Sequence, residues 1–147
     1  MIVFVEGIDK SGKDTIVRYI NEYTKYVHYV SARGPMSVIA YGSKFGRDVD
    51  AFEYLAKIAD DVLIIHLVVD EDDFNTRCKL TNEPYINFKF DSKLFEDAEV
   101  YCTNDLGLTV ATVNTSHHTP KQIARLVADT VRSLKGRKNE KHKHKKD

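Results

Sequence analysis

Short apolar runs separated by longer amphipathic stretches set the pattern of this chain. The runs at residues 2–6, 27–32, 62–69 and 108–113 are rich in β-branched and aromatic side chains, and they predict strands. The run at 62–69 is nearly continuous. Such a run is typical of a central parallel strand that helices cover on both faces.

The stretches between these strands predict helices, the clearest of them with apolar residues three or four positions apart. They lie at residues 15–25, 36–45, 50–59, 70–80 and 92–104, and a last one begins at Thr119-Pro120. Residues 81–91 contain Pro84 and show no period, so they predict a loop. Alternating strands and helices indicate parallel βαβ units with right-handed crossovers. The pattern therefore predicts an α/β fold with a four-stranded parallel sheet.

The charges balance overall but are distributed unevenly. The formal net charge is +0, yet seven Lys/Arg after Leu134 face only Glu140 and Asp147. Residues 1–134 then hold 15 basic and 20 acidic side chains. This predicts one folded domain at 1–134 and a disordered basic tail at 135–147. Such a tail is either a solvated segment or a contact for the phosphates of nucleic acid.

Two classes of protein are not indicated. The chain has no run of about 18 apolar residues, so the sequence predicts no membrane span. Cys78 and Cys102 lie far apart without a C-x-x-C partner, which argues against a disulfide framework or a structural zinc site. We therefore expect a cytoplasmic protein with two reduced thiols.

Residues 7–15 form the most informative segment. Gly7, Gly12 and Lys13 match the pattern G-x-x-x-x-G-K, which here follows a predicted strand and opens a predicted helix, as the pattern requires. The glycines allow successive N–H groups to point at anionic oxygens, and the helix adds its positive end. Lys13 is expected to reach the β- and γ-phosphates of ATP. The segment therefore predicts a phosphate loop in a three-layer sandwich of the P-loop NTPase type.

One position departs from the usual phosphate loop. The residue after the lysine is normally Ser or Thr, whose hydroxyl binds Mg²⁺, but here it is Asp14, followed by Thr15. A carboxylate is a good magnesium ligand, yet it adds negative charge near phosphates. Three alternatives stay open: Asp14 binds Mg²⁺ directly, Thr15 provides a hydroxyl, or metal binding is weakened. The first is favoured.

Several segments together resemble the thymidylate kinase family. Residues 4–13 carry the family's E-G-x-D-x-x-G-K form, and this segment is specific by itself. Residues 32–41 resemble a D-R-x-x-x-S-x-x-A-[FY] segment at the end of a strand. Residues 63–77 and 113–123 are similar at a weaker level. The resemblance covers most of residues 1–134 and implies the strand order second, first, third, fourth.

The resemblance implies roles at the acceptor end of the site. Asp9 matches a carboxylate near the acceptor sugar, and Arg33 matches the arginine that holds the acceptor phosphate. Ser37 and Tyr41 would line the acceptor pocket. Lys10 lies where some members place a catalytic arginine, and a cation there stabilises charge on the moving phosphoryl group.

The donor end follows in the same way. Arg77 would approach the donor nucleotide near the lid. The residues expected to bind ATP are Gly7, Ser11, Gly12, Lys13, Asp14, Thr15 and Arg77. The residues expected to act in catalysis are Lys13, Lys10, Arg33 and Asp9. Asp14 and Thr15 are the expected Mg²⁺ ligands.

The chain also departs from the family. The family's segment between the first helix and D-R, which includes an edge strand and much of the monophosphate-binding arm, is missing, and the aspartate of D-R is Ala32. Three functions stay open: an ATP-dependent kinase of a deoxynucleoside monophosphate or related nucleotide, a kinase of a larger acceptor such as a DNA hydroxyl, or a nucleotide-binding protein without catalysis. A homodimer is a further expectation. A trimmed member of this kind would suit a viral genome.

Two polar clusters have competing interpretations. Residues 70–73, Asp-Glu-Asp-Asp, could form a metal cluster, but acids at a helix start more often match the helix dipole. His117 and His118 could touch the adenine, or they could be an exposed pair in a loop. In both cases the simpler interpretation is favoured.

Overall fold

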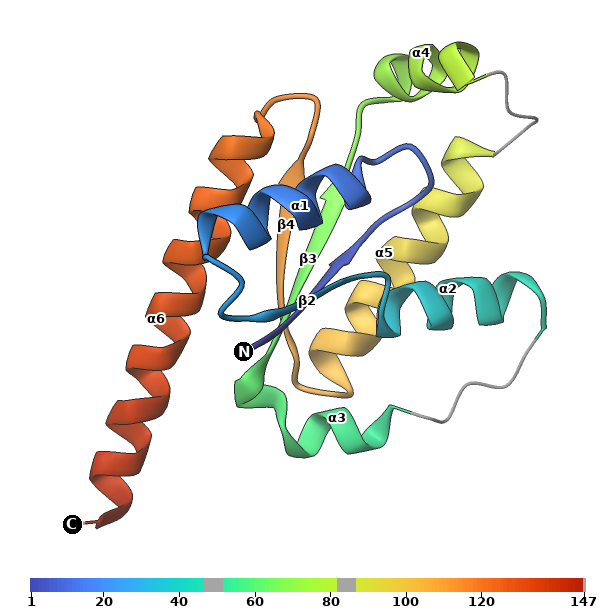
Figure 1. Ribbon diagram of the computed structural model, residues 1–147. Coiled ribbons are helices and arrows are strands. Elements are labelled where there is room, and N and C mark those ends of the chain that lie inside the picture. Colours follow the sequence, from blue (N-terminus) through green and yellow to red (C-terminus); the bar gives the residue numbers. More distant parts are fainter. Residues whose placement is uncertain (47–51, 82–86, 147) are drawn as a thin grey trace.

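The computed structural model describes residues 1–46, 52–81 and 87–146, with side chains described as far as Lys141. A sheet lies between two layers of helices (Figure 1). The elements are β1 (Ile2–Glu6), α1 (Lys13–Tyr23), β2 (Tyr29–Ala32), α2 (Pro35–Lys44), α3 (Glu53–Lys57), a 3₁₀ turn η1 (Ala59–Asp61), β3 (Val62–Val68), α4 (Glu71–Thr81), α5 (Phe88–Asn104), β4 (Thr109–Asn114) and α6 (Pro120–Lys146).

All strand pairs are parallel, and the order across the sheet is β2-β1-β3-β4. This is the predicted sheet and the predicted order. The register places Glu6 beside His66, and His66 beside Thr112. Near the carboxyl ends of the strands, a row of polar residues therefore crosses three of the four strands.

Helices cover the two faces of the sheet unequally. On one face, α1 and α6 pack on Val3, Val5, Leu63 and Ile65. On the other face, a cluster that includes residues of α2, α3, α4 and α5 packs around Ile64. Side chains alternate along a strand, so consecutive residues of β1 and β3 face opposite layers. The predicted three-layer architecture is confirmed.

Two elements begin at places that the periodicity did not indicate. β2 starts at Tyr29 instead of residue 27, because Lys25 and Tyr26 adopt left-handed φ values of 55° and 60° that end α1 in a turn. α5 starts at Phe88, so the end of the predicted loop at 81–91 is helical. The Asn87 side chain accepts a hydrogen bond from the Phe90 N–H at 3.1 Å, an N-cap that the sequence analysis overlooked. Residues 82–86, and 50–51 of the predicted helix 50–59, lie outside the described residues.

The basic tail is helical. α6 continues through Gly136 to Lys146, where the sequence analysis expected a disordered tail at 135–147. Lysine and arginine have good helix propensity, and one glycine costs a helix only about 1 kcal/mol. Two ion pairs join α6 to η1: Lys138 with Asp61, and Lys141 with Asp60 at 3.5 Å. No helix in the described ranges is apolar enough over a sufficient length to cross a membrane.

Candidate functional site

The loop between β1 and α1 has the backbone that the glycine pattern predicts. A Cβ on Gly7 would lie 2.4 Å from the Leu67 carbonyl oxygen and 2.8 Å from the Ser11 hydroxyl, so only glycine fits there. Gly12 precedes α1 with a left-handed φ of 96°, and no side chain caps the helix. The first N–H groups of a helix have no partner within the helix. Here they are left to bind an anion at the positive end of α1.

Lys13 lies inside this loop. Its Nζ donates hydrogen bonds to the carbonyl oxygens of Gly7 at 2.7 Å and Ile8 at 2.9 Å. Burial lowers the pKa of Lys13, the nearby Asp9 raises it, and Arg33 lowers it further. The ammonium is thus held next to both an acid and a second cation, at the place where phosphate oxygens would enter.

A charged hollow of about 460 Å³ opens beside the loop. It brings together most of the residues that the sequence analysis assigned to chemistry. The lining residues are Asp9, Lys10, Gly12, Lys13, Asp14, Thr15 and Arg33. Three cations and two carboxylates around one space suit a multiply charged ligand such as phosphate with a bound cation.

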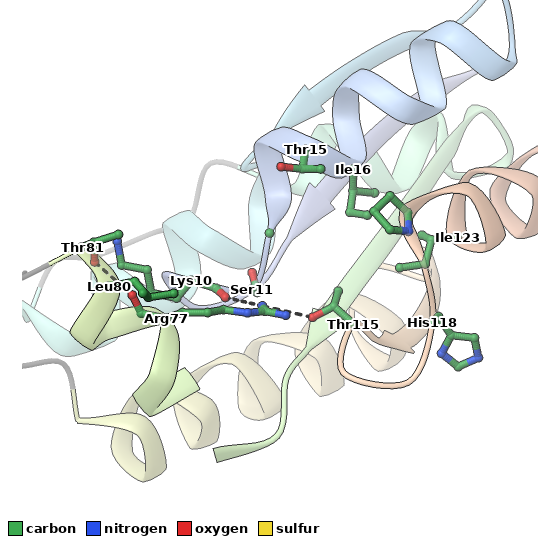
Figure 2. Close-up of a pocket in the computed structure, with 12 residues that line it drawn as sticks. Lys10, Ser11, Thr15, Ile16, Arg77, Leu80, Thr81, Thr115, His118 and Ile123 are labelled. Carbon is green, nitrogen blue, oxygen red and sulfur yellow. Dashed lines mark hydrogen bonds between the residues drawn. The ribbon is translucent and has the colours of Figure 1, made fainter. Parts of the chain in front are cut away.

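A second hollow of about 430 Å³ lies on the other side of the loop, between α4, α6 and the start of α1 (Figure 2). Its walls include the apolar residues Ile16, Leu80, Pro120 and Ile123. An apolar wall with a few polar groups is typical of a site for an aromatic base. This hollow is suited to the base of a nucleotide whose phosphates reach the loop.

Arg77 joins α4 to the phosphate loop. Its Nη1 donates to the Lys10 carbonyl oxygen at 2.6 Å and to the Thr115 hydroxyl at 3.4 Å, as Figure 2 shows. The arginine therefore lines the apolar hollow and also holds the loop in place. Leu80, Thr81 and Thr115 line the same hollow, but the sequence analysis gave them no role.

The two hollows meet at the loop. Lys10, Gly12 and Thr15 line both of them. Lys10 itself adopts a left-handed φ of 67°. Strained residues of this kind persist where the surrounding structure holds them, often at functional sites. The shared residues place the two hollows next to each other, on either side of the phosphate loop.

Glu6, to which the sequence analysis gave no role, holds the turn that follows Arg33 at the edge of the charged hollow. The carboxylate of Glu6 is fully buried and accepts three backbone N–H bonds at the start of α2. The donors are Gly34 at 2.8 Å, Met36 at 2.9 Å and Ser37 at 2.7 Å. Burial raises the pKa of Glu6, while these N–H groups lower it. Arg33 precedes them with a left-handed φ of 73°. The N–H of Arg33 donates to the Val5 carbonyl oxygen at 2.9 Å. β1 therefore holds the backbone of Arg33 through Val5 and the turn after it through Glu6.

Ser37 and Tyr41 lie deeper than expected. Ser37 is buried on α2 with its N–H bonded to Glu6, and it does not line either of the two hollows. Tyr41 packs edge-on against Phe95, with ring centroids 5.8 Å apart. Burial and the charge of Asp9 raise the pKa of Tyr41, while Arg33 lowers it, so the phenol lies near the charged hollow without lining it.

Asp14 and Thr15 both lie in the exposed first turn of α1 and both line the charged hollow. Among the described residues, no cluster of three or more His, Cys, Asp or Glu could hold a metal by itself. Mg²⁺ usually takes one or two protein carboxylates and completes its shell with water and phosphate oxygens. The oxygen donors present at this place fit that type of site.

The acidic cluster has the simpler role, whereas both interpretations of the histidine pair stay open. Glu71, Asp72 and Asp73 form the acidic first turn of α4, which matches the helix dipole. His117 pairs with Asp70 at 3.0 Å on the surface. His118 is exposed, and it also lines the apolar hollow.

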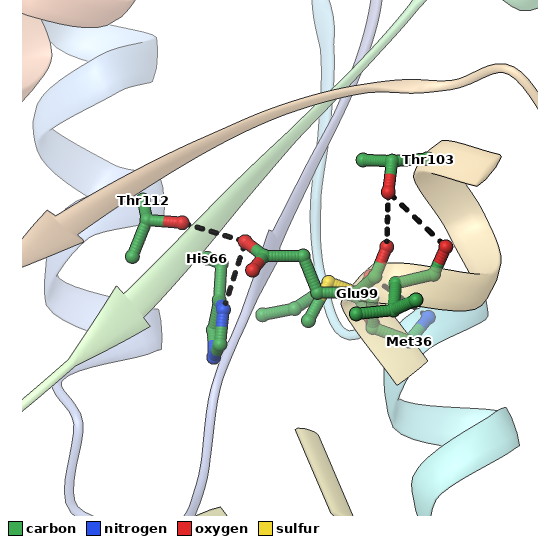
Figure 3. Close-up of polar contacts among 7 residues, drawn as sticks. Met36, His66, Glu99, Thr103 and Thr112 are labelled. Atoms are coloured by element: carbon green, nitrogen blue, oxygen red, sulfur yellow. Dashed lines mark hydrogen bonds and ion pairs between the residues drawn. The ribbon is translucent and has the colours of Figure 1, made fainter. Parts of the chain in front are cut away.

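A buried histidine lies behind the site. His66 on β3 contacts Glu99 of α5, with 3.3 Å between Nδ1 and Oε1, and the same oxygen accepts a 2.6 Å bond from Thr112 (Figure 3). The His66 ring stacks on Phe95. Burial lowers the pKa of His66, and Glu99 opposes this shift. In the sequence the histidine is a single polar residue within the apolar run 62–69, which is the signal that could have revealed it.

Comparisons with known proteins agree with this geometry at the level of the fold. No protein-family model matches the sequence, and no curated protein matches it. Two solved structures do. One is the YorR protein from Bacillus subtilis, in complex with phosphorylated GDP: the TM-score is 0.73 at 16% identity, over 90% of this chain and 96% of that chain. The other is thymidylate kinase from Candida albicans, with a TM-score of 0.57 at 15% identity, over 91% and 92%.

Both matches extend over nearly the full length of the two chains compared. At these identities the likeness concerns the fold and not the substrate. The parallel sheet, its strand order, the phosphate loop and both structural matches agree with one another. This chain has a thymidylate kinase-like fold of the P-loop type.

Proposed function

We propose that the protein is an ATP-dependent phosphotransferase that phosphorylates a deoxynucleoside monophosphate or a related nucleotide. The observation that carries the proposal is the pair of hollows that meet at Lys10, Gly12 and Thr15. The apolar hollow suits the base of the donor. The charged hollow suits the phosphate of the acceptor. A site with two unlike compartments on either side of one phosphate loop favours transfer over binding alone.

Each residue of the loop then has a task. Lys13 leaves the carbonyl oxygens of Gly7 and Ile8 to bind the donor phosphates, and Arg33 binds the acceptor phosphate. Lys10 stands between them, where a cation stabilises the charge of the transferred group. Asp14 and Thr15 would hold Mg²⁺, which supplies charge neutralisation at the phosphates. Asp9 orients the acceptor sugar.

A larger acceptor is the second candidate, and one observation favours it. β2 is an edge strand of the sheet, and Arg33 at its end is exposed. The acceptor side of the charged hollow is thus bordered by the sheet edge. A hydroxyl at the end of a nucleic acid strand could approach from this side as easily as a free nucleotide.

The test is a transfer assay with γ-labelled ATP or GTP and Mg²⁺. The acceptors are the eight common ribo- and deoxynucleoside monophosphates, and an oligonucleotide with free terminal hydroxyls. We expect labelled product from at least one monophosphate. Labelling of the oligonucleotide alone would favour the second candidate. Binding of the triphosphate without any transfer would contradict both.

Lys13→Ala is the variant that controls the assay. Removing a preorganised cation from a transferred phosphate should lower the rate by about 100-fold or more. The free energy of unfolding should change little, since the ammonium contacts only loop carbonyl oxygens. A variant that folds and transfers phosphate normally would show that this loop is not the active element.

A further inference from the structure

A groove runs between α1 and α6, on the side of these helices away from the sheet core. The two helices pack side by side (Figure 1). Two hollows of about 490 Å³ and 260 Å³ lie along their contact, and Tyr23 lines both. The first hollow reaches Lys121 near the start of α6, and the second reaches Lys135. We treat them as one α1/α6 groove.

One wall of the groove is a row of cations. Lys121, Arg125, Arg132 and Lys135 all line it from α6. Their spacing of 4, 7 and 3 residues places them on one stripe of the helix. Fourteen residues of helix span about 21 Å. One carboxylate, Glu22, also lines the groove. Arg132 also pairs with Asp129 of α6 at 3.8 Å, on the exposed surface. The side chains that line the groove from α6 nevertheless carry four positive charges and no negative one.

The opposite wall carries two tyrosine rings of α1. Tyr19 and Tyr23 both line the first hollow, Tyr23 also lines the second, and Tyr23 is 53% exposed. Tyr26 and Tyr29, which follow α1 and are 69% and 67% exposed, line neither hollow. The left-handed backbone at Lys25 and Tyr26 forms the turn that ends α1 just after Tyr23.

His28 adds a polar group to the same place. It lines the second hollow together with Lys135, whose charge is one of the causes, after burial, that lower the pKa of His28. Within the described residues its Nδ1 is buried without a hydrogen-bond partner. A ligand with hydrogen-bonding groups in the groove would provide one.

We propose that the α1/α6 groove is a binding site for single-stranded nucleic acid. Cations at regular intervals match a backbone of phosphates, and exposed tyrosines match the faces of unpaired bases. The length of about 21 Å corresponds to roughly six stacked nucleotides at about 3.4 Å each. A duplex hides its base faces and an acidic peptide has none. The aromatic wall therefore favours the single strand over either.

This inference is independent of phosphoryl transfer. The groove does not share a residue with the charged hollow. Binding can therefore be measured without a nucleotide, and a chain inactive as a kinase would still bind. The lysines and histidines of the tail, 138–146, prolong the positive stretch of sequence beyond the groove.

The experiment measures fluorescence anisotropy of a labelled oligo-dT 20-mer with the full chain between 50 and 200 mM salt. We expect saturable binding whose log K falls linearly with log salt. Four phosphate contacts correspond to a slope of about −3, since each contributes about −0.7 on a single strand. Arg125→Ala should reduce the slope by about 0.7. Lys57→Ala, an exposed lysine on α3, is the matched control and should leave it unchanged.

Tyr23→Ala tests stacking. It should weaken binding by about 5- to 150-fold, the range for loss of one stacked base. Tyr23→Leu preserves the apolar contact with the helices and should weaken binding as well, which separates stacking from misfolding. Tyr54→Ala on α3, where Tyr54 is 58% exposed, is the control and should bind as the unmodified chain does.

Three results would overturn the proposal. One is no binding at 50 mM salt. Another is equal affinity for a duplex of the same length, or for poly-glutamate, together with no effect of either Tyr23 variant, which would mean attraction between charges alone. The third is binding that survives loss of Arg125 and Arg132 together, which would place the nucleic acid elsewhere on the molecule.

Discussion

The face of the sheet beneath α1 and α6 buries a cluster that is aliphatic throughout the described residues, whereas the face beneath α2 and α5 buries ionisable groups among its apolar side chains. Glu6 is 0% exposed, His66 3% and Asp91 5%. The two faces share the same strands. Consecutive residues such as Val5 and Glu6 therefore enter entirely different surroundings.

The two faces of the sheet contribute differently to the protein. Burying a charged group without a partner costs several kcal/mol, so each must be matched. Glu6 is matched by N–H groups of α2, His66 by Glu99, and Asp91 by Lys44 at 2.9 Å. The aliphatic face stabilises the fold through the apolar surface that it buries. The polar face uses specific hydrogen-bond and ion-pair partners, which fix α2 and Arg33.

The largest effect should come from the aliphatic face. Leu63→Ala removes a completely buried side chain from the middle of the sheet. We expect a loss of about 3–5 kcal/mol in the free energy of unfolding, measured with urea, because a cavity remains. The transfer rate per folded molecule should be unchanged. Val38→Ala, where the side chain is 47% exposed, is the control and should change stability by about 0.5 kcal/mol or less. A raised KM for the acceptor in Leu63→Ala would contradict the view that the aliphatic face stabilises the fold without positioning the site.

Glu6 and Val5 provide the sharpest contrast, because they are neighbours on opposite faces. Glu6→Ala leaves three buried N–H groups without their acceptor, which should cost about 2–3 kcal/mol. The start of α2 then shifts, so Arg33 loses its position and the KM for the acceptor should rise by about tenfold or more. Val5→Ala should lose stability only.

Urea unfolding and steady-state kinetics on both variants check this contrast. Glu6→Gln provides a graded case, since an amide accepts through one oxygen and cannot satisfy all three donors. Its KM should lie between those of the parent chain and Glu6→Ala. If Glu6→Ala and Val5→Ala raise the acceptor KM equally, the polar face has no special role in positioning.

The sequence predicted the aliphatic face better than the polar one. Apolar periodicity alone gave the strands, their parallel arrangement and the helices that cover them, since period and burial are linked directly. The phosphate loop and the residues around the charged hollow followed from glycine spacing. Glu6 is the glutamate of the E-G-x-D-x-x-G-K form, but its partners are N–H groups more than 25 residues away. No local pattern encodes such a contact.

Ser37 and Tyr41 show the opposite limit. Resemblance placed both in the acceptor pocket. In the structure the backbone N–H of Ser37 bonds to Glu6, and the ring of Tyr41 packs on Phe95. Which side of a helix faces a ligand depends on how its first turn is capped. Here the Glu6 carboxylate of β1 fixes that turn. Position in a motif does not encode such a contact, so the acceptor-pocket roles of Ser37 and Tyr41 stay predictions.

Substitutions of Arg33 should separate stability from acceptor binding, and their effect on stability should be smaller than that of Glu6→Ala. Its φ of 73° is unfavourable for any residue with a Cβ. Arg33→Gly should therefore be about 1 kcal/mol more stable than Arg33→Ala in thermal unfolding. Both should raise the acceptor KM alike while leaving ATP affinity, measured by calorimetry, unchanged. Equal stabilities would show that the left-handed turn is not strained, and a loss of ATP affinity alone would remove Arg33 from the acceptor side.

The smallest effect concerns the pH dependence of the polar face. Burial lowers the pKa of His66 below its ordinary value of 6.5. As the pH falls through 6.5, the unfolded chain binds a proton at this residue and the folded chain does not. Stability from this source is therefore complete above pH 6.5 and declines below it, by at most about 1.4 kcal/mol per pH unit. His66→Gln should remove that part of the slope.

The measurement is urea unfolding of both chains at intervals from pH 5 to 7.5, and the quantity of interest is the difference between them. Glu6 acts in the opposite direction, because burial raises its pKa above 4.5 and its contribution is lost as the pH rises. It is common to both chains and cancels in the difference. His28→Gln is the control, since burial and Lys135 lower the pKa of His28 as well, but on the other side of the sheet. One result would contradict this prediction: the plots of unfolding free energy against pH are parallel for His66→Gln and the parent chain, while the plot for His28→Gln is flatter. The loss of stability in acid would then come from the α1/α6 side, and His66 would not contribute to it.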